Sequence, residues 1–389
     1  MKQDSPTRRD VVKYGGAVLT GGLLAGCTGS SDDDPATSTA TEANTATETA
    51  TETTTDGSYS VTMEPVGTVE FESVPETWVP YTADYADMGV ALGRGDDMAA
   101  IGVKARYGTH LYDDLPGVSV DKDDLTELWQ NGTGKEIYYE LDADVHVTDP
   151  NFMVNRLQWS EGDVEEISEG VAPFFGNTIF SRAYGWHDDY RYYSLYEAFE
   201  KLAAVFQERA RYEAFRELHD EVLADVEARL PSETPSVAVL YPAEVPPESF
   251  YPYLIGGGTQ SKHWNDLGVG DALAEHGVTD AQAGGGTIDF ETLLEIDPDA
   301  LAIRLQGEIS ESYFEENIRS HLESHDAASQ LSAVQNDRVV YGGLTYQGPI
   351  IHLFQLERAA QGLYPEAFGG EQLFDRQRVA DIVNGEFDA

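Results

Sequence analysis

The sequence predicts an α/β protein in which a long bridging helix joins two small open α/β lobes. Two observations lead to this fold class. A helix-to-strand pattern at 135–147 is echoed without a gap at 290–302, and one long helical periodicity separates the two segments. A helix that feeds an apolar strand is half of a parallel α/β unit, so the echo indicates two similar lobes. Chance similarity between two common connections is the alternative.

Residues 1–27 have the organisation of a secretory signal. Arg8-Arg9 precede a short apolar stretch over 14–26, and Leu24-Ala25-Gly26 precede Cys27. This order resembles a twin-arginine signal that ends in a lipobox. The resemblance implies that Cys27 carries a lipid and anchors the protein at the extracytoplasmic face of the membrane. A transmembrane anchor is the alternative, but the stretch is shorter than the ~20 residues that a spanning helix needs.

The next segment, 28–58, is almost wholly Thr, Ser, Ala, Asp, Glu and Gly. Such a segment cannot bury enough apolar surface to offset the entropy of ordering, so we expect a disordered stalk. Its threonines are candidates for O-glycosylation. Because Cys27 is the only cysteine of the chain, an intrachain disulfide is excluded.

Acidic residues dominate the composition. The chain has 70 Asp and Glu against 24 Lys and Arg, which gives a formal net charge of −46. Repulsion at this density would loosen a fold in dilute buffer, whereas molar salt screens it within ~3 Å. The composition therefore indicates adaptation to a salty, halophilic medium. It argues against nucleic acid as a partner, because phosphate binding needs a basic face.

Residues 59–188 are predicted to form the N-terminal ligand-binding lobe. Short apolar runs predict its strands, and an amphipathic segment over about 84–92 predicts a helix. The strand candidates are 78–81, 101–103, 145–147 and 171–175.

Residues 189–230 carry the longest helical signal. Apolar residues recur at spacings of three and four from Leu195 to Leu230, and Pro231 ends the run. At 1.5 Å per residue, one helix of this length would span on the order of 60 Å. Because that length exceeds one lobe, we expect this helix to bridge two.

Residues 231–389 are predicted to form the C-terminal ligand-binding lobe. Strands are expected at 236–241, 301–305 and 338–341, and helices near 266–276, 289–295 and 349–362. Ligands of open α/β sheets bind at the carboxyl ends of the strands. In two facing lobes these ends would border one cleft.

Other chemistries have weaker support. The Gly triplets at 256–258 and 284–286 lack the Gly-Lys-Ser/Thr of a phosphate loop, which favours flexible loops. His321 and His325 stand one helical turn apart, but Glu323 is displaced from the zinc-protease pattern, which favours a solvated helix face. No Gly-x-Ser-x-Gly elbow is present. We expect no metal centre and no cofactor.

Four motifs carry a family resemblance: Trp78-Val79-Pro80-Tyr81 with 85–93, Ile288-Asp289-Phe290-Glu291-Thr292 with Asp297-Pro298-Asp299, the run 331–341 and the run 362–368. Through these motifs, roughly residues 66–370 resemble the substrate-binding lipoproteins of ABC importers, in the class that binds ferric siderophores, haem and vitamin B12. The resemblance implies the class III periplasmic-binding fold. The segment 131–136 departs from the family, which usually repeats the C-terminal motif there.

In that family one glutamate on each lobe docks onto arginines of the two permease subunits. The resemblance assigns this role to Glu136 and Glu291, which occupy matching places in the echoed segments. Two rigidly spaced carboxylates suit bidentate pairing with guanidinium groups. The alternative is that each is an ordinary helix-start glutamate, which the helix macrodipole favours.

Aromatic and cationic residues crowd the loops that follow the predicted strands. Rings stack on an organic face and guanidinium groups pair with carboxylates, so these loops suit a large, partly planar, anionic ligand. The candidate ligand-binding residues are Tyr85, Arg106, Tyr107, Arg182, Tyr184, Trp186, Tyr251, Tyr253, Lys262, Trp264, Arg304 and Tyr346.

The function that the sequence favours is that of a lipid-anchored extracytoplasmic solute-binding protein, which catalyses nothing. It would capture an iron-siderophore, haem or cobalamin-type ligand in the cleft and deliver it to the subunits of an ABC permease. Iron chelate, haem and corrinoid stay open as alternatives because proteins for all three share this scaffold. The alternative function is a membrane-tethered extracellular hydrolase, which would turn its ligand over instead of binding it unchanged.

Overall fold

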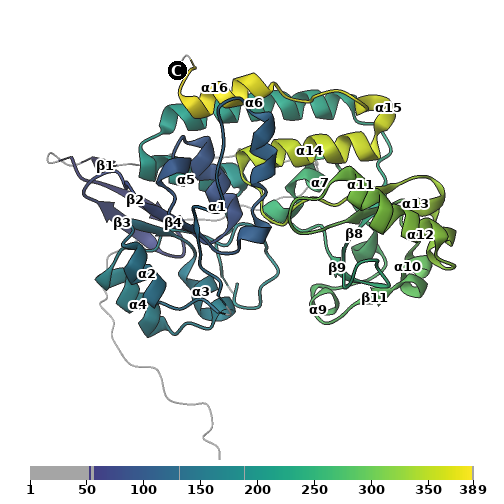
Figure 1. The fold of residues 1–389 in the computed structure, drawn as a ribbon, viewed down its shortest axis with the longest axis horizontal. Coiled ribbons are helices and arrows are strands. Elements are labelled where there is room, and N and C mark those ends of the chain that lie inside the picture. The colour runs from purple at the N-terminus through teal and green to yellow at the C-terminus, as the bar shows by residue number, and fades with distance from the viewer. Residues whose placement is uncertain (1–51, 54–56, 131, 188, 388–389) are drawn as a thin grey trace, which may run out of the picture. The chain divides into compact units, whose positions relative to one another are not determined.

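Parallel strand pairs form the framework of both halves of the chain (Figure 1). The structure is a computed structural model, which describes residues 52–53, 57–130, 132–187 and 189–387. The predicted signal over 1–27, its Cys27 and the stalk as far as residue 51 lie outside the described residues and stay predictions. Within the segment 28–58 that was expected to be disordered, Glu52–Thr53 instead pairs with β2 as a short strand, so the disorder prediction is wrong there. In the part of the chain that is described, no helix combines the length and the apolar character needed to cross a membrane.

The N-terminal lobe is built around short parallel strands. Its strands are β1 Glu52–Thr53, β2 Tyr59–Met63, β3 Gly67–Phe71, β4 Trp78–Pro80, β5 Ala100–Ile101, β6 Thr126–Glu127 and β7 Val145–Val147. Its helices are α1 Ala83–Ala91, α2 Glu136–Leu141, α3 Pro150–Leu157 and α4 Glu161–Gly170, with 3-10 turns η1 Gly95–Asp97, η2 Lys104–Arg106 and η3 Thr109–Asp114. β4 pairs with β7 and β5 with β6, both in parallel, while β2 and β3 form an antiparallel hairpin.

The C-terminal lobe contains one mixed sheet. Its strands are β8 Ser236–Pro242, β9 Ser249–Tyr253, β10 Gly270–Asp271, β11 Ile288–Asp289, β12 Ala300–Ile303 and β13 Val339–Tyr341. They follow the order β11-β9-β8-β12-β13, and β10 also pairs with β8. β8 is parallel to β10 and β12, and β12 to β13, whereas β9 is antiparallel to both of its neighbours. All four residues of β12 are buried and apolar, as in a sheet that is covered on both faces.

Short helices surround this sheet, and the longer helices α14 and α16 lie at the C-terminal end of the chain. They are η4 Thr259–Ser261, α7 Lys262–Asp266, α8 Ala272–Glu275, α9 Asp280–Ala283, α10 Phe290–Ile296, α11 Glu311–Phe314, the π turn η5 Glu315–Arg319, α12 Ser320–Ser324, η6 Ala328–Gln330, α13 Ser332–Gln335, α14 Pro349–Leu363, α15 Pro365–Phe368 and α16 Arg376–Asn384.

The two echoed segments fold alike. α2 leads into β7 and α10 into β12, and each helix ends at an aspartate with φ 46°, Asp142 and Asp297. Two residues later, Asp144 accepts the backbone N–H of Thr77 and Asp299 accepts that of Ser236, both at 2.9 Å, at the start of the neighbouring strand. The same sequence pattern thus performs the same structural task twice, and the predicted class of two α/β lobes is confirmed.

The prediction of one continuous helix over 189–230 is wrong. The chain forms α5 Leu195–Phe206 and α6 Arg209–Arg229 instead, because Gln207 takes a left-handed conformation with φ 56° and ψ 32° that ends α5. α5 packs against β2 in the N-terminal lobe. α6 runs beside α14 across the top of Figure 1, so the bridging role falls to α6.

Two further segments differ from the sequence prediction. The expected strand over 171–175 contributes only a single bridge, between Phe174 and His146. The expected helix over 266–276 is divided into α7, β10 and α8, because Gly268 takes φ 63°, which glycine permits at little steric cost.

Candidate ligand-binding site

Side chains that follow the strands of both lobes converge in one cluster. Tyr81 follows β4 and Arg106 follows β5 in the N-terminal lobe, while Tyr253 ends β9 and Tyr346 follows β13 in the C-terminal lobe. All three tyrosines interact electrostatically with Arg106. We define the strand-end cluster as Tyr81, Arg106, Tyr184, Tyr253, Arg304 and Tyr346.

Arg106 occupies the centre of the strand-end cluster. Its side chain is exposed, and its guanidinium interacts electrostatically with the phenol of Tyr346, which is only 6% exposed. Burial raises the pKa of Tyr346, so its phenol stays protonated at neutral pH. Arg106 therefore offers a solvent-accessible positive charge that a tyrosine from the other lobe holds in place.

Arg304 supports the strand-end cluster from below the surface. It is 3% exposed, and its Cζ lies 5.3 Å from the ring centroid of Tyr253. It donates to the carbonyls of Gln260 and Gly342, but its Nη1 has no hydrogen-bond partner among the described residues. Burial lowers the pKa of Arg304 from 12.5 to about 10, so the group is still charged at neutral pH. A buried guanidinium without a carboxylate partner favours negative charge nearby.

Aromatic rings extend the strand-end cluster on the N-terminal side. Tyr346 meets Phe180 edge to face at 4.9 Å between centroids, and Phe180 meets Tyr184 at 6.0 Å. Tyr184 stacks on Trp186 at 4.1 Å with an interplanar angle of 17°. The guanidinium of Arg156 lies 5.5 Å from the Tyr184 ring. These rings offer flat apolar surfaces beside positive charge.

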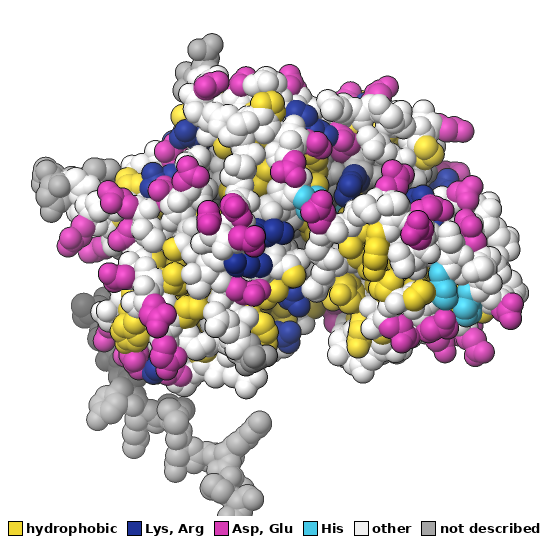
Figure 2. Space-filling model, viewed as in Figure 1, with side chains coloured by type: hydrophobic (Ala, Val, Ile, Leu, Met, Phe, Trp, Pro, Cys, Tyr) yellow, Lys and Arg dark blue, Asp and Glu magenta, His cyan; other side chains and the backbone are white. Residues whose placement is uncertain are grey.

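The arginines of this region lack acidic partners. Within the described residues, no ion pair involves Arg106, Arg156, Arg182 or Arg304. The other described arginines are divided: seven form ion pairs, whereas Arg191, Arg216, Arg338 and Arg358 form none. On the face seen in Figure 2, Lys and Arg side chains gather beside the hollow between the two lobes, and hydrophobic side chains border it. In a chain with 70 acidic residues, these arginines therefore remain available to an anionic ligand, although Glu127 also acts on Tyr81.

A glycine-rich loop joins the lobes next to the strand-end cluster. The backbone N–H groups of Thr259 and Gln260 donate to the carbonyls of Ile179 at 2.9 Å and Phe180 at 3.3 Å. A Cβ on Gly258 would lie 2.3 Å from the carbonyl oxygen of Phe180, so only glycine allows this approach. The triplet at 256–258 therefore serves as a lobe contact.

The structure brings together many of the predicted ligand residues. Arg106, Tyr184, Tyr253, Arg304 and Tyr346 belong to the strand-end cluster. Trp186 stacks on it, and Arg182 lies beside Gly257 in the loop contact. Tyr251 is 45% exposed and shares a face of β9 with Tyr253, because side chains two residues apart on a strand project the same way.

Four predicted ligand residues lie elsewhere. Tyr85, Tyr107 and Trp264 are at most 1% exposed and belong to the core, which leaves them no surface for a ligand. The Tyr85 hydroxyl bonds the backbone of Asn177, and the Tyr107 hydroxyl bonds the side-chain hydroxyl of Tyr112. Lys262 pairs with Asp266 at 3.0 Å. The prediction that these four residues contact the ligand is therefore wrong.

Sequence reasoning missed several residues of the region: Tyr81, Phe152, Arg156 and Phe180. Tyr81 is the last residue of the predicted strand 78–81, and this strand-end position was a usable signal. Phe152 and Arg156 lie on α3, a helix that the apolar periodicity did not reveal.

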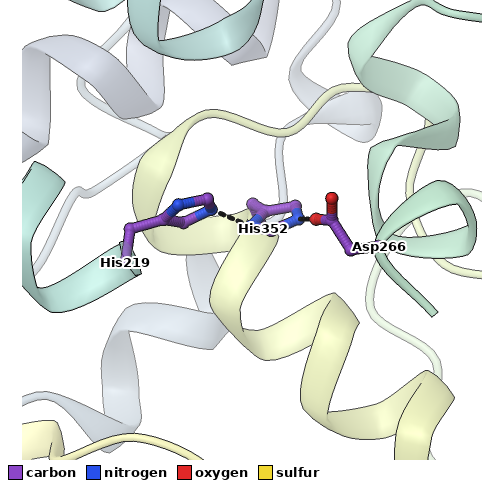
Figure 3. A group of neighbouring side chains, drawn as sticks. All are labelled: His219, Asp266 and His352. Carbon is purple, nitrogen blue, oxygen red and sulfur yellow. Dashed lines mark hydrogen bonds and ion pairs between the residues drawn. The ribbon is translucent and has the colours of Figure 1, made fainter. Parts of the chain in front are cut away.

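A buried chain of polar groups links three helices (Figure 3). His219 Nε2 of α6 lies 3.1 Å from His352 Nδ1 of α14, and His352 Nε2 lies 2.8 Å from Asp266 Oδ2 of α7. Asp266 also pairs with Lys262, so it is ionised and accepts the Nε2 proton of His352. Nδ1 of His352 then accepts from Nε2 of His219. Burial lowers the pKa of both histidines, which keeps them neutral.

These three groups are close enough together to suggest a metal site. However, Asp266 and His219 bond opposite nitrogens of the same ring, so they do not face a common point (Figure 3). The arrangement is explained by two hydrogen bonds that connect the helices α6, α14 and α7.

The histidine pair on the C-terminal lobe binds a carboxylate. His321 Nε2 and His325 Nε2 lie 3.4 and 3.5 Å from the two oxygens of Glu248. Nδ1 of His325 accepts the N–H groups of Ala327 and Ala328, both at 3.2 Å. A neutral ring that accepts at Nδ1 carries its proton on Nε2, so Nε2 has no lone pair for a metal.

The two predicted docking glutamates lie in matching places. Glu136 is the first residue of α2 and Glu291 the second of α10, and both side chains are exposed. Figure 1 places one helix in each lobe, both below α6 and α14. Their surface position agrees with the expectation, while the docking role itself stays a prediction.

The comparisons with known proteins agree with this architecture. PiuA, the substrate-binding protein of an iron uptake ABC transporter from Streptococcus pneumoniae, is 16% identical with a TM-score of 0.55, over 81% of this chain and 99% of PiuA. The petrobactin-binding protein YclQ from Bacillus subtilis is 15% identical with a TM-score of 0.53, over 76% and 95%. SirA from Staphylococcus aureus, complexed with staphyloferrin B, is 15% identical with a TM-score of 0.52, over 82% and 99%.

At these identities the solved structures establish a common fold. A comparison of the sequence with curated proteins finds no match. The family model described as periplasmic binding protein matches residues 79–344, which is more than half of the chain and includes most of both lobes. The chain therefore belongs to the periplasmic binding protein family.

Proposed function

We propose that this protein captures an anionic iron chelate at the strand-end cluster and delivers it to an ABC permease. One observation carries the proposal: exposed Arg106 lies among tyrosines of both lobes, in a region where four arginines have no acidic partner in the described chain. Of these four, Arg304 is buried, and a buried charge without an ionic partner costs free energy that a bound anion would offset. A ligand that contacts Arg106 and Tyr253 would touch both lobes at once.

The chemistry of the strand-end cluster favours a ligand with both flat organic surface and negative charge. Tyr184 and Trp186 present stacked rings, whereas Arg106 supplies an exposed charge and Arg304 a buried one. Ferric complexes of polycarboxylate or catecholate chelators combine these properties. Haem, with two carboxylates on a flat ring, is the second candidate. A neutral corrinoid would leave the arginines unpaired, so it fits less well.

The relatives with the same fold support this ligand class. PiuA serves iron uptake, YclQ binds petrobactin and SirA is complexed with staphyloferrin B. The matched positions of Glu136 and Glu291 support delivery to a two-subunit permease, because two equivalent contacts suit two equivalent partners. The proposal includes no chemical step on the ligand.

Titration of the full chain with candidate ligands tests the proposal. The ligands are the ferric complexes of staphyloferrin B and petrobactin, haem and cobalamin, and quenching of Trp fluorescence reports binding. We expect a ferric chelate to bind and Arg106→Ala to weaken it by ~1.5–3 kcal/mol, about tenfold to a hundredfold, as for a charge-assisted hydrogen bond. Arg106→Lys should retain part of the affinity.

Arg216→Ala on α6 is the matched control, because Arg216 is also exposed and its loss changes the net charge equally. It should bind like the wild type. Equal affinity of wild type and Arg106→Ala would remove Arg106 from the site. Preferential binding of cobalamin would overturn the anionic ligand, and recovery of a chemically altered ligand would overturn a pure binding role.

A further inference from the structure

A narrow cavity between the lobes is distinct from the strand-end cluster. Its walls include His110 of η3 from the N-terminal lobe, His263 of α7, and Gln355 and Arg358 of α14, with Leu111 and Leu344 as apolar lining. None of the six residues of the strand-end cluster lines it. The space admits one occupant of about the size of a water molecule or a small ion.

His263 directs a hydrogen-bond donor into this cavity. The amide nitrogen of Gln347 donates to the carbonyl of Thr259 and lies 2.9 Å from Nδ1 of His263. Gln347 therefore donates to Nδ1 as well, and the neutral ring carries its proton on Nε2. His263 is 1% exposed and its Nε2 has no partner among the described residues. Burial holds its pKa well below the usual value, so the ring is neutral.

Gln355 supplies a second unused donor. Its amide oxygen accepts the backbone N–H of Leu344, which fixes the orientation of the amide. Its nitrogen is left without a described partner, although the side chain is only 4% exposed. A Cβ on Gly343 would lie 2.1 Å from the amide oxygen of Gln355 and 3.4 Å from Nε2 of His263. Both polar groups therefore converge on one glycine, which leaves the space between them open.

The charges around the cavity are mixed but favour an anion. Arg358 contributes a guanidinium to the wall and forms no ion pair with any described residue. The exposed carboxylates of Glu308 and Asp113 act on His110 from outside and oppose this charge. A water molecule needs acceptors as well as donors, whereas the unused groups of His263 and Gln355 are donors. Nδ1 of His110 is also without a described partner, and it too donates when the ring carries its proton there.

We propose that this cavity is a binding site for a small monovalent anion of about the size of chloride. Nε2–H of His263 and the amide N–H of Gln355 would donate to it, and Arg358 would balance its charge. Because His110 of the N-terminal lobe lines the same cavity, the bound anion would lie between the lobes and apart from the transported ligand.

Bromide serves as the probe. The full chain is transferred from sodium gluconate to sodium bromide at constant ionic strength, and the ⁸¹Br NMR linewidth and the midpoint of thermal unfolding are measured. The wild type should broaden the bromide line and unfold at a higher temperature in bromide. Crystals soaked in bromide should give an anomalous peak within hydrogen-bond distance of His263 Nε2 and Gln355 Nε2.

Two variants test the assignment. Gln355→Glu keeps an acceptor for Leu344 but replaces the donor with an acidic group, and it should weaken bromide binding more than tenfold. Arg358→Gln alters an exposed side chain, so folding should be retained, and it should weaken binding severalfold. Arg378→Gln on α16 removes one charge outside the cavity and should bind as the wild type does.

Equal line broadening by the wild type and Arg358→Gln would overturn the proposal, even if Gln355→Glu fails to fold. An anomalous map without a peak in the cavity would also overturn it and would leave a single water molecule as the occupant.

Discussion

Asp87 shows how one buried carboxylate joins two parts of the fold. It lies on α1 with no exposed surface and accepts the backbone N–H groups of Ile350 at 2.9 Å and Ile351 at 3.0 Å, at the start of α14. The hydroxyl of Tyr112 donates to its other oxygen at 2.7 Å. Burial raises the pKa of Asp87 from 3.8 to about 7, because it outweighs these hydrogen bonds, which favour the ionised form.

Asp87→Asn should flatten the dependence of stability on pH. The folded protein holds the Asp87 proton up to about pH 7, whereas the unfolded chain releases it near 3.8, so folding takes up a proton in this window. The free energy of unfolding of the wild type therefore falls as the pH rises through the window and levels off above it. The contribution is on the order of 4 kcal/mol. Urea unfolding at several pH values measures it.

Asp96→Asn is the matched control for this prediction, since Asp96 is exposed and its loss changes the net charge equally. Its stability curve should stay parallel to that of the wild type. If the curve of Asp87→Asn also stays parallel, Asp87 is ionised throughout the window and the burial argument fails.

At the scale of single residues, the sequence predicts the chemical type of the site better than it predicts which residues form it. Arg106 and Tyr346 were found because they follow strands, and strand ends form sites in this fold class. Tyr85, Tyr107 and Trp264 have the same residue types, but they turn into the core. The apolar pattern around them does not say which way a ring in a loop or short helix points. Only the packed structure separates them.

At the scale of elements, Gln207 decides whether one helix or two connect the lobes. The apolar spacing runs on through Phe206 and Ala210, so periodicity alone predicts a single helix. The left-handed backbone at Gln207 ends α5, and the N–H of Gln207 bonds the carbonyl of Ala204. Hydrophobic spacing does not detect such a break, because both helices bury the same kind of face on either side of it.

Gln207→Gly should stabilise the protein by about 0.5–1 kcal/mol, because glycine adopts the left-handed conformation without the steric cost of a Cβ. In a continuous helix the same substitution would cost about 0.5–1 kcal/mol, so the sign of the change separates the two arrangements. Urea unfolding measures it. Glu217→Gly, at an exposed position inside α6, should destabilise the protein and serves as the reference for a helical interior.

The echo between the lobes was predictable because identical positions perform identical tasks. The aspartates at 144 and 299 hold the starts of neighbouring strands, and those at 142 and 297 end the helices before them. The antiparallel hairpin of β2 and β3 precedes the parallel strands of the N-terminal lobe, whereas in the C-terminal lobe the antiparallel strand β9 is part of the main sheet, between β11 and β8. Such lobe-specific additions carry no internal repeat, so comparison of the two halves does not reveal them.

At the scale of the whole molecule, the two lobes present the same helix start to their surroundings. α2 and α10 precede equivalent strands, and Glu136 and Glu291 lie at their first turns. In the proposed function, these two exposed carboxylates would contact two related permease subunits.

Reversal of both charges tests this docking surface. Glu136→Arg with Glu291→Arg should leave folding and ligand affinity nearly unchanged, because both side chains are exposed and are outside the strand-end cluster. Uptake of the ferric chelate into cells should fall about tenfold or more, since like charges would then face each other at the permease.

Glu140→Arg with Glu295→Arg is the matched control. It changes the net charge equally, one turn later on the same two helices and at positions that are also exposed, and it should reduce uptake much less. Equal uptake by wild type and the first pair would reject the docking role. Lost ligand binding by that pair would instead place these glutamates at the ligand.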